Sequence, residues 1–371
     1  MGPSHDKLVG LVLSPIISSY RDKESPTLYR PLVTLSGVLF AAALLALGAL
    51  TGCGHATPIS SAASPTATPV VPSVTAEFAI PTSSAGVTAL AVGANGSIWF
   101  TESSADRIGQ LETNGSVVDY PLPTAAAMPK DLVAAPDGNL WFTEYSGNKI
   151  GKINTTGSTI VEYALPTSGS QPDGITLGSD GALWFTEAGT SKIGRITTAG
   201  AITEYTIPTA NADPTSIAPG SDGALWFTEY NSAKIGRITT AGAITEYSVA
   251  AGSEPTSILS GADGAIWFLE QGTNKIGRIL TNGTGLTETT LAVPTGATPT
   301  IGAIAEGADS NFYFTDIAGN KIGRYLSNGG TVTEYPITTS ASSPLAIALG
   351  PDQRIYFSES AGNKIGQLSY F

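Results

Sequence analysis

Seven acidic residues recur along the second part of the chain, each three positions after an aromatic residue. They are Glu102, Glu144, Glu187, Glu229, Glu270, Asp316 and Glu359. Such a set of carboxylates could hold a divalent cation. However, a Lys or Arg follows each acid, and the short loop between Glu229 and Lys234 predicts that the two side chains pair across a hairpin. Such pairs contribute roughly 0.2–1 kcal/mol and fix strand register. Because a binding site needs groups that break the symmetry, we interpret the acids as part of the architecture.

Function is expected where the copies differ, at the starts of the innermost strands. Two residues before the apolar residue of each inner strand, the copies carry Thr88, Lys130, Asp173, Thr215, Thr256, Gly302 and Leu345. Lys130, Asp131 and Asp173, with Tyr145 and Tyr230 just after the second strands, form what we call the rim sector. The rim sector is a candidate ligand-binding rim, and ordinary surface variation is the alternative.

A repeat of about 42 residues positions these side chains. Its aromatic markers are separated by 42, 43, 42, 41, 46 and 43 residues, and they are Trp99, Trp141, Trp184, Trp226, Trp267, Tyr313 and Tyr356. One copy contains four predicted strands, at 216–218, 225–229, 234–239 and 244–248. A period of this length with four strands is typical of propeller blades. The sequence therefore predicts an all-β, seven-bladed β-propeller.

The ring is predicted to close through its N-terminal segment. The last copy shows three predicted strands, at 345–349, 354–359 and 364–369, and no fourth. Residues 77–82, Glu-Phe-Ala-Ile-Pro-Thr, match fourth-strand segments such as 204–209. We therefore expect this segment to complete the last blade and leave no open sheet edge. The spacing of 46 and Thr289 in place of the usual Tyr predict a protruding loop at 291–299.

The segment before the repeats predicts export. Arg30 precedes an apolar run over 32–50, as in a secretory signal, and Leu-Thr-Gly-Cys at 50–53 resembles the lipobox of bacterial lipoproteins. The resemblance implies lipidation of Cys53, the only cysteine; an uncleaved membrane anchor is the alternative. We expect a signal peptide over 1–52, lipidated Cys53 and a Pro/Ser/Thr/Ala-rich spacer over 53–76, and the propeller over 77–371. The lipid alone would hold the protein on the extracytoplasmic side of the cell envelope.

Composition narrows the range of partners. The formal net charge is −12 and there is no Lys/Arg block, so we expect no nucleic-acid partner. The 43 glycines and 24 prolines among only 13% charged residues fit many turns between short buried strands. We expect a monomer.

The repeated motif Trp-Phe-Thr-Glu, Asn-Lys-Ile-Gly-Arg-Ile and Glu-Tyr-x-Ile-Pro-Thr resembles the streptogramin B lyase (virginiamycin B lyase) family, and more widely the propellers related to NHL repeats. The resemblance covers 77–371. It implies a metal-assisted elimination with a general-base His at the inner-strand start of a late blade and a second His from the next. The matching positions here are Gly302 and Leu345, and Glu359 matches an acidic metal ligand. The only histidines, His5 and His55, precede the predicted propeller.

Two main hypotheses follow. The first is a module that binds a small molecule, peptide, glycan or protein at the channel face, with no cofactor and no catalysis. The alternative is a Mg²⁺-dependent carbon–oxygen lyase with a base other than His, such as Lys130 or a carboxylate. A purely structural role as a spacer or assembly module is a third reading.

Overall fold

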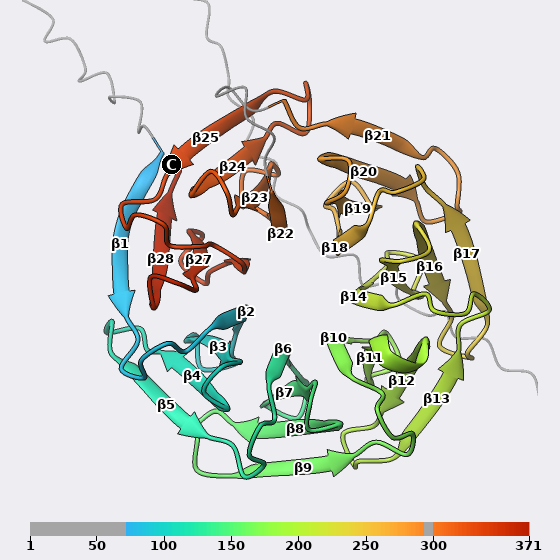
Figure 1. Cartoon of the computed structure of the whole chain (residues 1–371), viewed down its shortest axis with the longest axis horizontal. Helices are drawn as coiled ribbons and strands as arrows, with labels where there is room; N and C mark the ends of the chain where they lie inside the picture. Colours follow the sequence, from blue (N-terminus) through green and yellow to red (C-terminus); the bar gives the residue numbers. More distant parts are fainter. Residues whose placement is uncertain (1–71, 293–299, 371) are drawn as a thin grey trace, which may run out of the picture. The chain divides into compact units, whose positions relative to one another are not determined.

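The computed structural model describes residues 72–292 and 300–370, which form seven antiparallel sheets of four strands, arranged as blades around a central channel (Figure 1). The first three complete blades are β2 (Val87–Val92), β3 (Ile98–Glu102), β4 (Arg107–Leu111) and β5 (Val117–Pro121); β6 (Pro129–Ala134), β7 (Asn139–Glu144), β8 (Lys149–Asn154) and β9 (Ile160–Ala164); and β10 (Pro172–Leu177), β11 (Leu183–Glu187), β12 (Lys192–Ile196) and β13 (Ile202–Thr206). A short 3-10 helix, η1 (Ala188–Thr190), follows β11.

The next three blades are β14 (Pro214–Pro219), β15 (Leu225–Glu229), β16 (Lys234–Ile238) and β17 (Ile244–Ser248); β18 (Pro255–Ser260), β19 (Ala265–Glu270), β20 (Lys275–Leu280) and β21 (Thr287–Thr290); and β22 (Ile301–Glu306), β23 (Phe312–Asp316), β24 (Lys321–Tyr325) and β25 (Val332–Pro336). The last blade contains β26 (Ile347–Leu349), β27 (Ile355–Glu359) and β28 (Lys364–Ser369), together with β1 (Ser73–Ala79). None of the described residues belongs to a helix long and apolar enough to cross a membrane.

The predicted closure of the ring is confirmed. The last sheet has the strand order β1-β28-β27-β26, and β1 runs antiparallel to β28 (Figure 1). Glu77 on β1 accepts a hydrogen bond from the Lys364 ammonium at 2.7 Å and one from the Thr339 hydroxyl at 2.9 Å. The pairing begins at Ser73, four residues before the predicted start of the propeller.

The second strand of each blade is buried along its whole length, except for Asn139 at the start of β7, which explains its run of apolar residues. All five residues of β15 are buried. Its Trp226 belongs to a core cluster with Ile266 and Phe268 of the following blade. A strand covered on both faces by neighbouring blades needs apolar side chains on both sides.

Each third strand contains an Ile-Gly pair, as in Ile235-Gly236. A glycine at this place predicts a close approach of the Trp ring or of a neighbouring blade. Instead, a Cβ at Gly236 would lie 2.1 Å from the ring of Phe227, its cross-strand partner in the same blade. The Phe ring lies flat over the glycine, so no larger residue fits there without a shift.

Asp222-Gly223 joins the first and second strands of its blade, and an Asp-Gly pair in such a tight hairpin predicts positive φ at both residues. In the structure only Gly223 of the pair has a left-handed backbone, with φ of 78°. Asp222 acts through its side chain: it accepts hydrogen bonds from the Trp226 indole at 3.3 Å and from Arg237 Nε at 2.7 Å. The turn is therefore fastened to the second and third strands.

The predicted protruding loop falls mostly on residues 293–299, which lie outside the described residues. Leu291, at its start, is buried. The fourth strand of that blade, β21, has only four residues, and Thr289 stands in it where five of the other blades carry Tyr.

Candidate functional site

The lysines beside the repeated acids pair with a different carboxylate from the predicted one. Glu229 and Lys234 are cross-strand neighbours, so the predicted register is confirmed. The predicted ion pair is wrong: Lys234 Nζ bonds to Glu246 of the fourth strand at 3.1 Å and to the Thr209 hydroxyl at 2.6 Å. Equivalent pairs occur in five other blades, as Lys149–Glu162, Lys192–Glu204, Lys275–Glu288, Lys321–Glu334 and Lys364–Glu77. Each of these pairs joins the third and fourth strands of one blade.

The acids that end the second strands are almost completely inaccessible to solvent. Burial raises the pKa of Glu102 and Glu144 to about 8, and the pKa of Glu229 and Glu270 to about 7. Where a hydroxyl is near, it donates to the carboxyl, as Ser232 does to Glu229 at 2.7 Å. These protonatable groups belong to the blade architecture and not to a solvent-accessible site.

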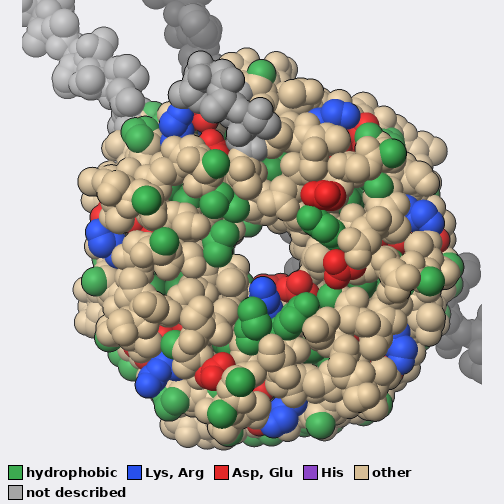
Figure 2. Space-filling model, viewed as in Figure 1, with side chains coloured by type: hydrophobic (Ala, Val, Ile, Leu, Met, Phe, Trp, Pro, Cys, Tyr) green, Lys and Arg blue, Asp and Glu red, His purple; other side chains and the backbone are tan. Residues whose placement is uncertain are grey.

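The unequal inner-strand positions do come together. All seven line one cavity of about 310 Å³ in the channel, and they are Thr88, Lys130, Asp173, Thr215, Thr256, Gly302 and Leu345. Figure 2 shows a basic and several acidic side chains gathered at the edge of the central hole, over the inner ends of β6 and β10. The inner-strand positions at which the copies differ therefore line the channel.

Within the rim sector, Lys130 and Tyr145 are in contact. The Lys130 ammonium lies 5.4 Å from the centroid of the Tyr145 ring. This is the distance at which the negative face of an aromatic ring attracts a cation. The rim sector thus already holds one ammonium group against an aromatic face.

Asp131 has a structural role. Its carboxylate accepts hydrogen bonds from the backbone N–H of Leu132 at 2.8 Å and of Ile175, on the next blade, at 2.9 Å. Burial raises the pKa of Asp131 to about 6, although these two N–H groups lower it. Asp131 therefore links two inner strands and is not free to hold a ligand.

Asp173 is held in place by its backbone and has a free carboxylate. The Thr143 hydroxyl donates to its carbonyl oxygen at 2.7 Å, across the blade boundary. Within 72–292 and 300–370, no side chain or backbone group hydrogen-bonds to the Asp173 carboxylate. Burial raises the pKa of Asp173 to about 7, the Lys130 ammonium opposes this, and the Asp131 and Asp213 carboxylates add to it.

Two acids next to the rim sector were missed by the sequence analysis. The Tyr230 hydroxyl donates to Glu254 at 3.0 Å, and Asp213 lies within electrostatic reach of Tyr145, Asp173 and Tyr230. Asp213 and Glu254 each precede the proline that starts an inner strand, and their φ angles of 52° and 49° are left-handed. The equivalent residues Gly86, Met128, Gln171 and Ser343 are left-handed as well, so this backbone conformation belongs to the blade architecture and only the acidic side chains distinguish these two copies. An acidic residue directly before the proline that starts an inner strand was the sequence signal that could have identified both.

The positions matched to the family's catalytic groups do not form a metal site. A Cβ at Gly302 would lie 2.7 Å from the Thr315 hydroxyl, and Leu345 is apolar, so neither position offers a ligand atom. Glu359 is fully buried and both its oxygens lack a hydrogen-bond partner, but the same is true of Glu102 and Glu144. Among the described residues, no group of three or more His, Cys, Asp or Glu side chains is placed to hold a metal ion. These residues therefore do not fit the divalent cation that the resemblance implies.

Comparison with known proteins agrees with this architecture. The family model for the virginiamycin B lyase family matches residues 71–249 and 204–370. The structure of virginiamycin B lyase from Staphylococcus aureus is 41% identical, has a TM-score of 0.74, and covers 80% of this chain and 99% of its own. A catalytically inactive His-to-Ala variant of that enzyme, with quinupristin, gives 40% identity with the same coverage and TM-score. A streptogramin B lyase structure is 37% identical over 79% of this chain and 96% of its own, with a TM-score of 0.74. No curated protein sequence matches the chain.

Proposed function

Since the chain belongs to the virginiamycin B lyase family, we propose that it uses the family's propeller as a binding module and not as a lyase. The ligand in this proposal carries an amine or guanidinium group, as a basic peptide, protein segment or small molecule would. It binds at the channel mouth, to the members of the rim sector other than Asp131, together with Asp213 and Glu254. Neither a cofactor nor a nucleic acid takes part, and the protein acts as a monomer.

One observation carries this proposal: the Lys130 ammonium lies against the Tyr145 ring while the Asp173 carboxylate beside it has no hydrogen-bond partner. Aromatic faces and carboxylates together favour a cation, since the ring quadrupole and the negative charge act in the same direction. Tyr230 and Glu254 extend the same chemistry to the following blades. The position of the Lys130 ammonium marks the place where a ligand's ammonium group would meet an aromatic ring and a carboxylate.

The expected result is saturable binding of cadaverine and agmatine to residues 54–371, measured by isothermal titration calorimetry, with no binding of glutarate. Asp173→Asn should weaken binding about tenfold, because a charge-assisted hydrogen bond is lost. Asp137→Asn, in the turn beyond the other end of an inner strand, is the matched control and should change nothing.

The pH dependence gives a second readout of the same site. The pKa of Asp173 is raised to about 7, so its charge develops as the pH passes through neutrality. Amine binding should therefore strengthen between about pH 6 and about pH 8 in the parent, and not in Asp173→Asn. Binding of glutarate, or unchanged amine affinity in Asp173→Asn, would overturn the proposal.

A lyase with a base other than His is the second candidate, supported by the identity to virginiamycin B lyase from S. aureus. It would need a base in the channel, and Lys130 is the basic side chain there. The S. aureus variant that lacks one histidine is described as catalytically inactive. Because this chain has Gly302 and Leu345 at the matched positions, we favour binding.

We further propose that the protein is a lipoprotein on the extracytoplasmic side of the cell envelope. Residues 1–52 and Cys53 lie outside the described residues, so this rests on the basic flank, the apolar run and the lipobox resemblance. Cys53→Ser should move the protein from the membrane fraction to the soluble fraction on cell fractionation. Continued membrane retention would indicate an uncleaved anchor instead.

A further inference from the structure

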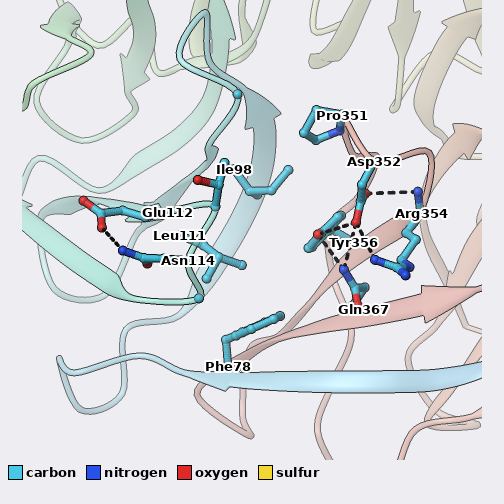
Figure 3. Close-up of a pocket in the computed structure, with 13 residues that line it drawn as sticks. Phe78, Ile98, Leu111, Glu112, Asn114, Pro351, Asp352, Arg354, Tyr356 and Gln367 are labelled. Carbon is cyan, nitrogen blue, oxygen red and sulfur yellow. Dashed lines mark hydrogen bonds and ion pairs between the residues drawn. The ribbon is translucent and has the colours of Figure 1, made fainter.

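A second cavity lies far from the rim sector, at the boundary where the last blade meets the first. It measures about 350 Å³, and we call it the seam cavity (Figure 3). Ile98 and Leu111 of the first blade form an apolar wall, Asp352 and Tyr356 of the last blade face them across the gap, and Arg354 lies beyond Asp352 in this view. Phe78, on the closing strand β1, borders the cavity from below in this view.

The cavity exists because the last blade departs from the repeat. In the first four blades the second-strand Trp stacks on the fourth-strand Tyr, as Trp226 does on Tyr247 with ring centroids 5.4 Å apart. In the last blade Tyr356 stands in place of Trp and Phe78 in place of Tyr. The third-strand Arg, which in the third blade lies over the Trp ring, is replaced by Gln367.

A second broken stack has the same consequence. In the fifth blade Thr289 stands in place of Tyr, and a cavity of about 520 Å³ opens beside Trp267 at that blade boundary. Cavities therefore form where the stack is incomplete, since smaller side chains leave volume that the rigid blades do not fill. At the seam both stack positions keep an aromatic ring, but each side chain is smaller than its counterpart, and Gln367 stands where the third to sixth blades carry Arg.

The polar wall offers donors and no free acceptor. The Asp352 carboxylate is already engaged by Arg354 Nη1 at 3.0 Å, the Tyr356 hydroxyl at 3.1 Å and Gln367 Nε2 at 3.1 Å. Arg354 uses only Nη1 in its side-chain hydrogen bonds, and its side chain is 42% exposed. On the first blade, Glu112 accepts a hydrogen bond from Asn114 at 3.1 Å. A ligand's acceptor group is therefore directed toward Arg354 and away from Glu112.

We propose that the seam cavity binds a planar aromatic carboxylate. The ring lies between the apolar wall of Ile98 and Leu111 and the Tyr356 ring, in the volume that the smaller side chains of this blade leave open. The carboxylate meets the Arg354 guanidinium, whose planar donor array matches a carboxylate. This site is independent of the channel.

The probes are indole-3-acetate, indole and tryptamine, which share a ring and differ in charge. Ligand-observed NMR titration of residues 54–371 should show saturable binding of indole-3-acetate, at least about tenfold tighter than indole, and no binding of tryptamine. Arg354→Gln should lower the affinity for indole-3-acetate about tenfold and leave indole within about twofold.

The double variant Tyr356→Trp/Gln367→Arg restores the residues of the other blades and fills the cavity from within. It should abolish binding of all three probes and raise the unfolding temperature, because buried volume is filled. Tighter binding of tryptamine than of indole-3-acetate, no binding of any probe to the parent, or unchanged affinity in Arg354→Gln would overturn the proposal. Amine binding at the rim sector should be unaltered in Arg354→Gln, which separates this site from the channel.

Discussion

Raising the pH from about 5 to about 9 should lower the free energy of unfolding of the propeller, by on the order of 1.4 kcal/mol per pH unit for each buried acid that keeps its proton. Glu102 and Glu144 have pKa values raised by burial to about 8 in the folded protein, against an ordinary value of 4.5. Between these values the folded state holds protons that the unfolded state releases. Stability is therefore fully present below pH 4.5 for these groups and is lost as the pH rises toward 8.

The fourth-strand acids act in the opposite direction at low pH. Hydrogen bonds from the lysine and threonine neighbours hold the pKa values of Glu162 and Glu204 below their ordinary range, although burial opposes this. Their contribution is present above the ordinary value of 4.5 and is lost as the pH falls through their lower folded-state pKa. The two sets together predict a stability maximum near about pH 4.5, where the fourth-strand acids are ionised and the buried acids have not yet begun to lose their contribution.

Guanidinium denaturation at a series of pH values measures this curve. Glu144→Gln is the informative variant, because it keeps the shape of the side chain and removes the titration. We expect a shallower loss of stability above about pH 6 and a more stable protein than the parent at about pH 9. A parent protein whose stability rises between pH 6 and pH 9 would show that the buried acids are ionised in the folded state.

Removal of residues 1–80 should destabilise the ring far more than removal of residues 1–71. The longer deletion takes away β1, exposes the edge of β28 and leaves Lys364 without Glu77. It also removes Phe78, which packs on the core cluster of Ile98 and Phe100. Phe78 is half-buried, but Ile80, removed with it, is buried in the same cluster. Loss of a buried Ile side chain costs about 2–5 kcal/mol and loss of the strand pairing adds to it, so we expect the unfolding temperature to fall by about 10 °C.

Circular dichroism and size-exclusion chromatography measure the outcome, since an exposed strand edge invites association between molecules. A matched rescue places residues 73–82 after Tyr370 through a flexible Gly/Ser linker in the longer deletion. This chain should regain a monomeric state and most of the lost stability. Equal unfolding temperatures for the two deletions would contradict the closure.

The blade architecture could be predicted because it is encoded locally and repeated. The bounds of β15, Leu225–Glu229, were predicted correctly from its unbroken apolar run. The pairing of β1 with β28 followed from comparing residues 77–82 with fourth strands. Residues that recur in every copy could be assigned to the blade, and residues that differ between copies to a candidate site.

The side-chain contacts were less predictable, because strand register fixes which Cα atoms are neighbours and not where long side chains point. Lys234 is opposite Glu229 in the hairpin, yet its flexible stem brings the ammonium to Glu246 on the fourth strand. Glu229 is buried, and an ionised carboxylate is costly away from water. For this reason Lys234 pairs with Glu246 and not with Glu229.

The candidate site was predicted in part. Comparison of the inner-strand starts across the seven copies identified Lys130 and Asp173, which line the channel. It missed Asp213 and Glu254, because their orientation depends on left-handed backbone angles in the connections between blades. The seam cavity depends on the joint volume of Phe78 and Tyr356, which are far apart in the sequence and meet only when the ring closes.

We propose that this chain keeps the family's propeller and not its elimination chemistry. The most direct test incubates residues 54–371 with quinupristin and Mg²⁺ and follows the compound by liquid chromatography with tandem mass spectrometry, since an elimination opens the ring without changing the mass. We predict that the cyclic compound is recovered intact. A ring-opened isomer that forms with the parent protein and disappears with Glu359→Gln would contradict the claim.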